Sequence, residues 1–275
     1  MFEGWNVGVV VPARNESKYI QDVIEKMPSF VDKIVVIDDG STDGTGDLVK
    51  NADLITLGGE GVGAAIDAGH RHLLSVLEKP FVSVVMAGDG QMDPDDMTTI
   101  IQPIVTSKAH HVKGERKDRF RSMPLIRQFG TYILMILTTL ACGQTIRDPQ
   151  CGYTATSYRV LEKWNWNNSW RGYGYPNWWL MQISKNGWTL EHRPVKAIYS
   201  GQDSGIIIPS FFVKVSIMLL AGLHIRIIDN TINKQSFFIF ITWITYICGW
   251  IYSPILWIVT HLFDRLHVFT IRREI

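Results

Sequence analysis

The chain has 275 residues, of which 46% are hydrophobic and 19% charged, and its formal net charge is +1. This composition excludes an intrinsically disordered protein, and the near-neutral charge lacks the basic field typical of nucleic-acid-binding proteins. The length suits one sizeable domain with an appendage. Cys142, Cys151 and Cys248 are widely spaced and match no metal-binding pattern, so we expect free thiols rather than disulfides.

The first 85 residues alternate between short apolar runs and amphipathic stretches. The runs predict strands at 6–11, 33–37, 54–57 and 81–85. Apolar residues at helical spacing predict a helix after the first strand, and Ser17 is expected to cap it. Strands that alternate with helices indicate an α/β fold with a mostly parallel sheet.

A polar cluster follows each of these predicted strands. The clusters occupy residues 12–17, 38–45, 58–63 and 87–94. Because ligands of parallel α/β sheets bind beyond the carboxyl ends of the strands, we expect the clusters to meet at one site. The glycines of 58–63 do not fit the dinucleotide-binding spacing, since Ile66 stands where the third glycine belongs. We interpret that cluster as a tight turn in which the backbone approaches a ligand.

The cluster after the fourth strand has a donor set suited to a metal ion. Asp89 and Gln91 place a carboxylate and an amide oxygen two residues apart, just past a buried strand. Hard cations such as Mg²⁺ or Mn²⁺ prefer oxygen ligands and keep room for substrate phosphates. The pair therefore predicts a metal site. The alternative is an Asx-rich turn that only caps the helix beginning near Asp95.

The middle of the chain is first basic and then apolar. Residues 110–121 form the most positive segment, and a solvated charged loop is one interpretation of it. Arg116 and Arg127 flank the next apolar segment and are placed to grip phosphate bidentately. The uncharged stretch 132–142 is too short to span a membrane and suits a groove wall or a partly embedded helix. A last strand is predicted over 188–195.

The C-terminal part has a different character. Residues 206–228 indicate helices along a membrane interface, and residues 235–263 contain no Asp, Glu, Lys or Arg. At about 1.5 Å per residue, the uncharged stretch exceeds the roughly 30 Å hydrocarbon core of a bilayer. It predicts one tilted span kinked at Pro254, with a re-entrant pair or a buried soluble helix as alternatives.

Four motifs, in their order along the chain, resemble those of family-2 glycosyltransferases with the GT-A fold. They are 11–16 (VPARNE), 36–45 (VIDDGSTDGT), 88–94 (GDGQMDP) and 148–153 (DPQCGY). More narrowly, the chain is similar to the dolichol- or polyprenyl-phosphate sugar synthases, the dolichol-phosphate mannosyltransferase group. The resemblance implies an α/β, Rossmann-like, mostly parallel sheet with helices on both faces, followed by interfacial and transmembrane helices.

The motifs and the composition together predict a domain organisation. It consists of a GT-A catalytic domain over 1–205, amphipathic juxtamembrane helices over 206–234, a transmembrane segment over 235–263 and a basic tail over 264–275. The N-terminus enters a strand without a basic-then-apolar leader, so we expect no signal peptide. Together with the resemblance, this predicts a membrane protein whose catalytic domain faces the cytoplasm.

The implied reaction is an inverting transfer of a sugar from GDP-mannose or a UDP-sugar to a polyprenyl or dolichyl phosphate. The implied nucleotide-binding residues are Pro12, Ala13, Glu16, Asp38, Asp39 and Ser41. Asp89 and Gln91 would bind Mg²⁺ or Mn²⁺, and Arg116 and Arg127 would face the phosphates. Asp148 would orient the acceptor or the sugar, with a turn-forming role beside Pro149 as the alternative. No nucleic-acid partner is expected.

Two positions depart from the pattern of this family. Ala87 stands where the usual Asp-x-Asp has its first aspartate, so one metal ligand or donor contact is missing. Residues 173–177 hold no acid where many relatives place a glutamate, which affects the acceptor-side contacts. An alternative of another class is a membrane-anchored nucleotide-sugar-binding protein that has lost catalysis. A polysaccharide- or glycolipid-synthesising enzyme is the nearest alternative enzyme, although its usual Gln-x-x-Arg-Trp motif is missing here.

Overall fold

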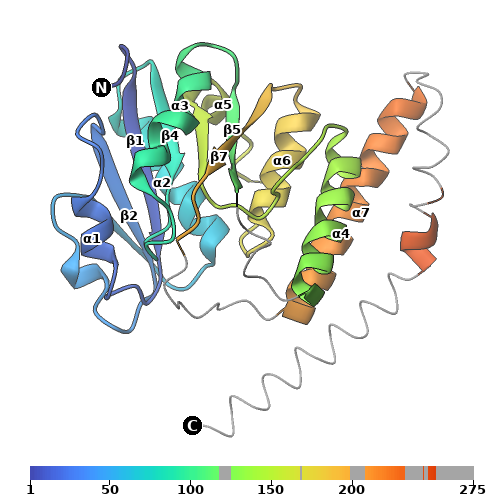
Figure 1. Ribbon diagram of the computed structural model, residues 1–275, viewed down its shortest axis with the longest axis horizontal. Coiled ribbons are helices and arrows are strands. Elements are labelled where there is room, and N and C mark those ends of the chain that lie inside the picture. Colours follow the sequence, from blue (N-terminus) through green and yellow to red (C-terminus); the bar gives the residue numbers. More distant parts are fainter. Residues whose placement is uncertain (118–124, 168, 199–207, 233–243, 245–246, 252–275) are drawn as a thin grey trace, which may run out of the picture. The chain divides into compact units, whose positions relative to one another are not determined.

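The structure is a computed structural model that describes the chain except residues 118–124, 168, 199–207, 233–243, 245–246 and 252–275 (Figure 1). The chain divides into two compact units. The first contains residues 1–123, 150–176 and 186–203, and the second contains 124–149, 177–185 and 204–275.

The first unit is built on a seven-stranded sheet with the order β3-β2-β1-β4-β6-β5-β7. The strands are β1 (Asn6–Ala13), β2 (Lys33–Asp39), β3 (Asp53–Leu57), β4 (Phe81–Val85), β5 (His111–Arg116), β6 (Thr154–Ser157) and β7 (Leu190–Val195). Strand β6 runs antiparallel to β4 and β5, and the other neighbours are parallel. The expected mostly parallel α/β sheet is therefore confirmed.

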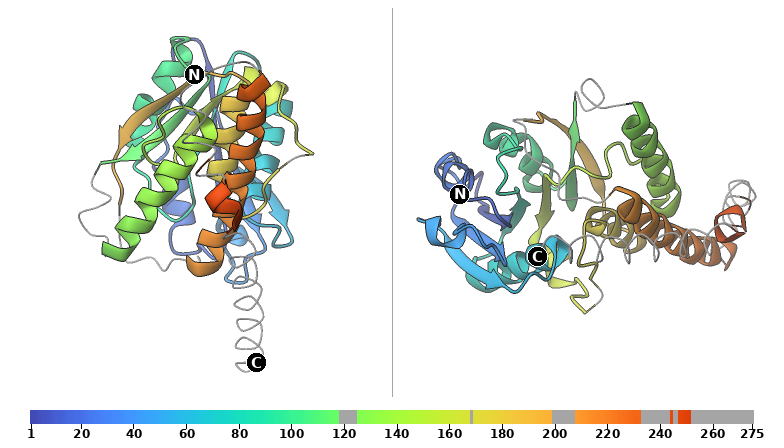
Figure 2. Two further views of the ribbon diagram at one scale, coloured as in Figure 1. Left: turned by 90° about the vertical axis from the view of Figure 1, so that its right-hand side faces the viewer. Right: turned by 90° about the horizontal axis from the view of Figure 1, so that it is seen from below.

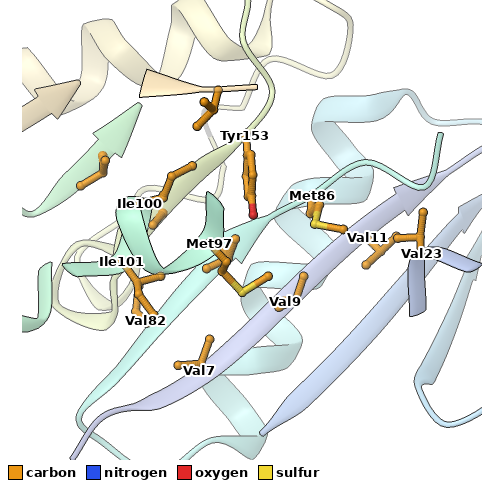
Figure 3. Packing of buried hydrophobic residues seen from close by; sticks show 14 of the residues in the cluster. Val7, Val9, Val11, Val23, Val82, Met86, Met97, Ile100, Ile101 and Tyr153 are labelled. Atoms are coloured by element: carbon orange, nitrogen blue, oxygen red, sulfur yellow. The ribbon is translucent and has the colours of Figure 1, made fainter. Parts of the chain in front are cut away.

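Helices cover both faces of this sheet (Figure 2). Val7, Val9 and Val11 of β1 belong to a core cluster that also holds residues of α1 (Ile20–Glu25) and α3 (Met97–Val105), as Figure 3 shows. The alternate residues of β1 meet α2 (Val62–Val76) on the other face. There a Cβ on Gly69 would lie 2.2 Å from Val10, so α2 packs closely because this position has no side chain.

The remaining elements of the first unit are short. They are η1 (Gly46–Leu48), η2 (Pro94–Asp96) and α5 (Tyr158–Glu162). Helix α6 (Tyr175–Lys185) begins in the first unit, and its residues from Asn177 onward belong to the second. One predicted cap is wrong: α1 starts at Ile20 after Tyr19, without a side-chain cap. The backbone N–H of Ser17 instead donates to Asp43, 3.0 Å away, because the loop before α1 is tied to the loop after β2.

The second unit is helical. Helices α4 (Leu125–Cys142) and α7 (Ile208–Ile232) pack against each other, as Figure 1 shows. The Arg226 guanidinium donates to the Leu140 carbonyl oxygen, which satisfies a backbone acceptor near the end of α4. All three cysteines are free, as expected.

Among the described residues, no helix combines the length and the apolar run needed to cross a membrane. The expected membrane helices therefore have no support from the structure. Within the predicted juxtamembrane segment 206–234, the structure describes helix α7. Most of 235–263 and all of the predicted tail lie outside the described residues.

Candidate active site

Three loops converge where β1 lies between its two neighbours in the sheet. Ala13 at the end of β1 pairs with Asp38 of β2 on one side. On the other side, the N–H of Gly88 beyond β4 donates to the Pro12 carbonyl at 3.1 Å. After β1 the chain continues to β2 on one side of this point, and after β4 it continues to β5 on the other side. Ligands of open α/β sheets usually bind where the strand order reverses in this way. The structure thus brings the predicted motifs after β1, β2 and β4 together.

The loops after β1 and β2 are joined by hydrogen bonds. The N–H of Asn15 donates to Ser41 Oγ at 2.9 Å, and that of Glu16 donates to Thr45 Oγ1 at 2.8 Å. Asn15 holds a left-handed backbone with φ of 58°, a conformation that asparagine tolerates better than most residues. These bonds fix the two loops against each other before any ligand arrives.

Two buried aspartates at the end of β2 hold backbone amides. Asp38 Oδ1 accepts from the N–H of Ser41 at 2.9 Å. Asp39 accepts from the N–H groups of Glu60 and Gly61 at 2.6 and 2.8 Å, one on each carboxylate oxygen. Asp39 therefore positions the turn after β3, and its expected contact with a nucleotide stays a prediction.

The glycine turn after β3 is approached by the protein's own backbone. The N–H of Gly63 donates to the Arg171 carbonyl at 2.8 Å. A Cβ on Gly63 would lie 1.9 Å from the Trp170 carbonyl oxygen, so only glycine fits. At Gly63, the backbone that approaches this turn is therefore that of the segment containing Trp170 and Arg171.

The loop after β4 contains the expected metal ligands. Asp89 is half-buried, and its Oδ1 accepts from the N–H of Gln91 at 2.9 Å. Burial raises the pKa of Asp89 because its charged form loses hydration. Ala87 is half-buried as well, and its N–H lies 3.4 Å from Met92 Sδ.

These residues fit a hard divalent cation that is shared with a substrate. The described residues contain no cluster of three His, Cys, Asp or Glu side chains able to hold a metal by themselves. The predicted protein donors are one carboxylate, from Asp89, and one amide, from Gln91. A cation would also offset the cost of the half-buried Asp89 charge. Mg²⁺ and Mn²⁺ are commonly held by one or two carboxylates together with substrate phosphates.

Comparison with known proteins decides the family. Residues 8–164 match the model of glycosyl transferase family 2. The chain belongs to this family. The resemblance seen in the motifs is confirmed, and the protein is a family-2 glycosyltransferase.

Relatives of this glycosyltransferase come from archaea among other organisms. An uncharacterized protein of Methanocaldococcus jannaschii is 30% identical over 199 residues, 70% of this chain and 81% of the relative. The UDP-N-acetylglucosamine--dolichyl-phosphate N-acetylglucosaminyltransferase of Methanococcus voltae is 28% identical, over 70% of this chain and 85% of the relative.

A solved structure has the same fold. Glucosyl-3-phosphoglycerate synthase of Mycobacterium tuberculosis, in complex with phosphoglyceric acid, superimposes with a TM-score of 0.63 at 19% identity. The match covers 80% of each chain. A complex of that enzyme with Mn²⁺, UDP and glucosyl-3-phosphoglycerate gives a TM-score of 0.59 at 19% identity, also over 80% of each chain. These matches confirm the GT-A fold.

The other predicted site residues are placed less fully. Arg116 is the last residue of β5, which is parallel to β4 through the intervening β6, so it lies at the same sheet edge as Asp89. Arg127 lies in the first turn of α4, and its side chain is outside the described residues. Asp148 is fully buried in the second unit. The roles of these three residues stay predictions.

A buried lysine, Lys113, lies beside one of the motifs and was not predicted. It belongs to the segment 110–121, for which a solvated charged loop was one interpretation, but it lies in β5 with 1% of its surface exposed. Its ammonium group donates to the carbonyl oxygen of Cys151. No pattern in the sequence distinguishes it from Lys117, which follows in the same segment and is exposed.

Glu16 should make the stability of the glycosyltransferase depend on pH. Partial burial, and then the charges of Asp89 and Asp43, raise the pKa of Glu16 from 4.5 to about 7. Below pH 4.5 the carboxyl is protonated in the folded and the unfolded chain, so it imposes no penalty. As the pH rises to 7, the unfolded chain loses a proton that the folded chain retains, and stability falls until ionisation is complete.

The variant Glu16→Gln should abolish that pH-dependent penalty. The free energy of unfolding of the variant minus that of the wild type should be smallest near pH 4.5 and should reach a plateau above pH 7. Urea unfolding between pH 4.5 and 8 measures this difference. A difference that stays constant across that range would contradict the assignment.

Proposed function

We propose that this glycosyltransferase transfers a sugar, with inversion, from a nucleoside-diphosphate sugar to a polyprenyl or dolichyl phosphate. The observation that carries the proposal is the position of Asp89, directly beyond β4 and beside the joined loops of β1 and β2. A carboxylate at this point can direct a divalent cation to the diphosphate of a nucleotide bound on those loops. The relative from Methanococcus voltae, which is named as a dolichyl-phosphate transferase, supports the choice of acceptor.

The loops after β1 and β2 hold the nucleotide in this proposal. Pro12, Ala13, Glu16, Asp38 and Ser41 line them, and Asp39 acts through the turn after β3. Asp89 and Gln91 would hold Mg²⁺ or Mn²⁺. When bound, the ion supplies positive charge that stabilises the departing nucleoside diphosphate.

The transfer itself is a displacement at the anomeric carbon. An oxygen of the acceptor phosphate forms a bond to that carbon while the bond to the donor diphosphate breaks, and the nucleoside diphosphate leaves. A phosphate monoester has a second pKa of about 6, so its oxygen is already largely anionic near neutral pH. The enzyme therefore needs to position and neutralise charge more than to remove a proton. We assign the charge neutralisation to Arg116 and Arg127 and the orientation of acceptor or sugar to Asp148.

A lipid acceptor requires an enzyme that works at a membrane, and we propose the cytoplasmic face. An exposed apolar stripe on helix α4 supports this proposal. Phe129, Tyr132 and Ile136 follow a helical repeat on this helix and are 66%, 54% and 42% exposed. Large apolar side chains gathered on one exposed stripe are typical of surfaces that contact a membrane or a partner.

Ala87 favours a second candidate function. Compared with the usual Asp-x-Asp pattern, it leaves the loop after β4 with one carboxylate fewer. This would suit a nucleotide-sugar-binding protein that no longer catalyses transfer. The two functions differ in whether a donor is consumed.

The test is transfer from a panel of radiolabelled GDP- and UDP-sugars to polyprenyl phosphate in detergent. We expect a lipid-extractable product with Mg²⁺ or Mn²⁺ and none with EDTA, because the leaving diphosphate then lacks its counter-charge. Nucleotide binding without product for any donor would favour the binding protein.

A further inference from the structure

The segment directly after β7 is bound to the loop that contains the predicted metal ligands. We call residues Lys196–Ile198 the clamp segment. The N–H of Ile198 donates to the Gln91 carbonyl at 3.0 Å. Ala197 forms an antiparallel bridge with Met92. The clamp segment thus adds a short strand-like pairing to this loop.

Lys196 connects the clamp segment to two acidic residues that follow the predicted metal ligands Asp89 and Gln91. Its backbone N–H donates to Asp96 Oδ2 at 2.6 Å, and its Nζ donates to Asp93 Oδ2 at 2.9 Å. Asp93 uses its other oxygen to accept from the N–H of Asp95 at 3.0 Å, at the start of η2. Asp93 is therefore joined both to the helix start and to the clamp segment.

These contacts restrict both sides of Gln91. Its N–H donates to Asp89, and its carbonyl accepts from Ile198. The neighbouring Met92 folds back so that its sulfur lies 3.4 Å from the N–H of Ala87. The same side chain leaves no room at Gly152, where a Cβ would lie 2.9 Å from the Met92 methyl.

The two predicted metal ligands of this loop, Asp89 and Gln91, depend on such outside contacts. Ala87 has no side chain that could serve as a further ligand. Ligand geometry must then be set before binding, by groups that do not touch the metal. We infer that Lys196 is a positioning residue, which acts through Asp93 and the clamp segment to hold Asp89 and Gln91 in the geometry that a divalent cation needs. This inference rests on the proposed function, since it assigns the role of these ligands.

The experiment compares Lys196→Met with the wild type and with Lys196→Arg. Mn²⁺ binding is measured by electron paramagnetic resonance, alone and with UDP, and the Mn²⁺ dependence of transfer is measured separately. We expect Lys196→Met to weaken Mn²⁺ binding roughly tenfold, with kcat at saturating Mn²⁺ reduced less than about twofold. Lys196→Arg should recover most of the binding, because it keeps a cation near Asp93.

Lys26→Met is a matched control. Lys26 and Asp22 form another surface pair at 2.7 Å, and the Lys26 side chain is 63% exposed against 65% for Lys196. This control should bind Mn²⁺ as the wild type does. Unchanged Mn²⁺ binding in Lys196→Met, or a wild type that binds no Mn²⁺ with or without UDP, would overturn the inference. A wild type that binds Mn²⁺ but transfers no sugar would contradict only the proposed function, and the binding comparison would still decide the role of Lys196.

Discussion

Replacing Asp89 with asparagine should lower metal-dependent sugar transfer by at least about 100-fold, the cost typical of losing one group that stabilises developing charge. Asparagine has nearly the same shape and keeps an oxygen that can accept from the N–H of Gln91. The variant therefore loses the anionic ligand and little else. Because burial raises the pKa of Asp89, a neutral side chain should leave the unfolding temperature at pH 7.5 unchanged or higher.

The measurement pairs initial transfer rates with thermal unfolding of the same samples. Asp22→Asn serves as the control, since Asp22 is exposed on α1 and should affect neither quantity strongly. Transfer by Asp89→Asn within twofold of the wild type would exclude Asp89 as the metal ligand. Lost transfer together with a lower unfolding temperature would indicate damage to the fold instead.

Replacing Gly63 with alanine should have the largest effect on stability, about 3 kcal/mol or more of the free energy of unfolding, the upper part of the range for overpacking. The added Cβ would lie 1.9 Å from the Trp170 carbonyl oxygen, a backbone atom that cannot rotate away as a side chain can. The hydrogen bond from the Gly63 N–H to Arg171 would be lost as the segments separate. Because alanine favours the helix that starts here, any loss comes from the collision.

Gly58→Ala is the matched control for this prediction. It lies in the same turn, and an added Cβ there would meet nothing within 4 Å. Urea unfolding of both variants gives the comparison. Equal stability of the two variants would show that the segment containing Trp170 and Arg171 does not depend on its contact with the glycine turn.

Strands β1 to β4 and β7 could be predicted from the sequence, most closely where a strand is an apolar run. β1, β2 and β4 are such runs, and β4 was placed at its observed bounds, Phe81–Val85. β6 was missed because its four residues, Thr154–Ser157, are small or polar and show no apolar run, although all four are buried. β5 was missed because its buried Lys113 resembles the residues of a charged loop.

The sequence predicts those parts of the site that directly follow the carboxyl ends of the parallel strands. Parallel strands bring their carboxyl ends to one edge, so the position of Asp38 and Asp89 at the same edge follows from the alternation of strands and helices. Contacts between distant segments could not be predicted in this way. The bonds from Lys196 to Asp93 and Asp96, and the approach of Trp170 to Gly63, depend on how the completed sheet packs its connections.

The most direct test of the central claim is the identity of the acceptor atom. Purified enzyme with Mn²⁺ and the radiolabelled donor panel is offered either polyprenyl phosphate or the same polyprenol without its phosphate. We predict a labelled lipid only with the phosphate, with one nucleoside diphosphate released for each sugar transferred and with inversion at the anomeric carbon. Equal labelling of the unphosphorylated polyprenol, or no lipid product with any donor, would contradict it.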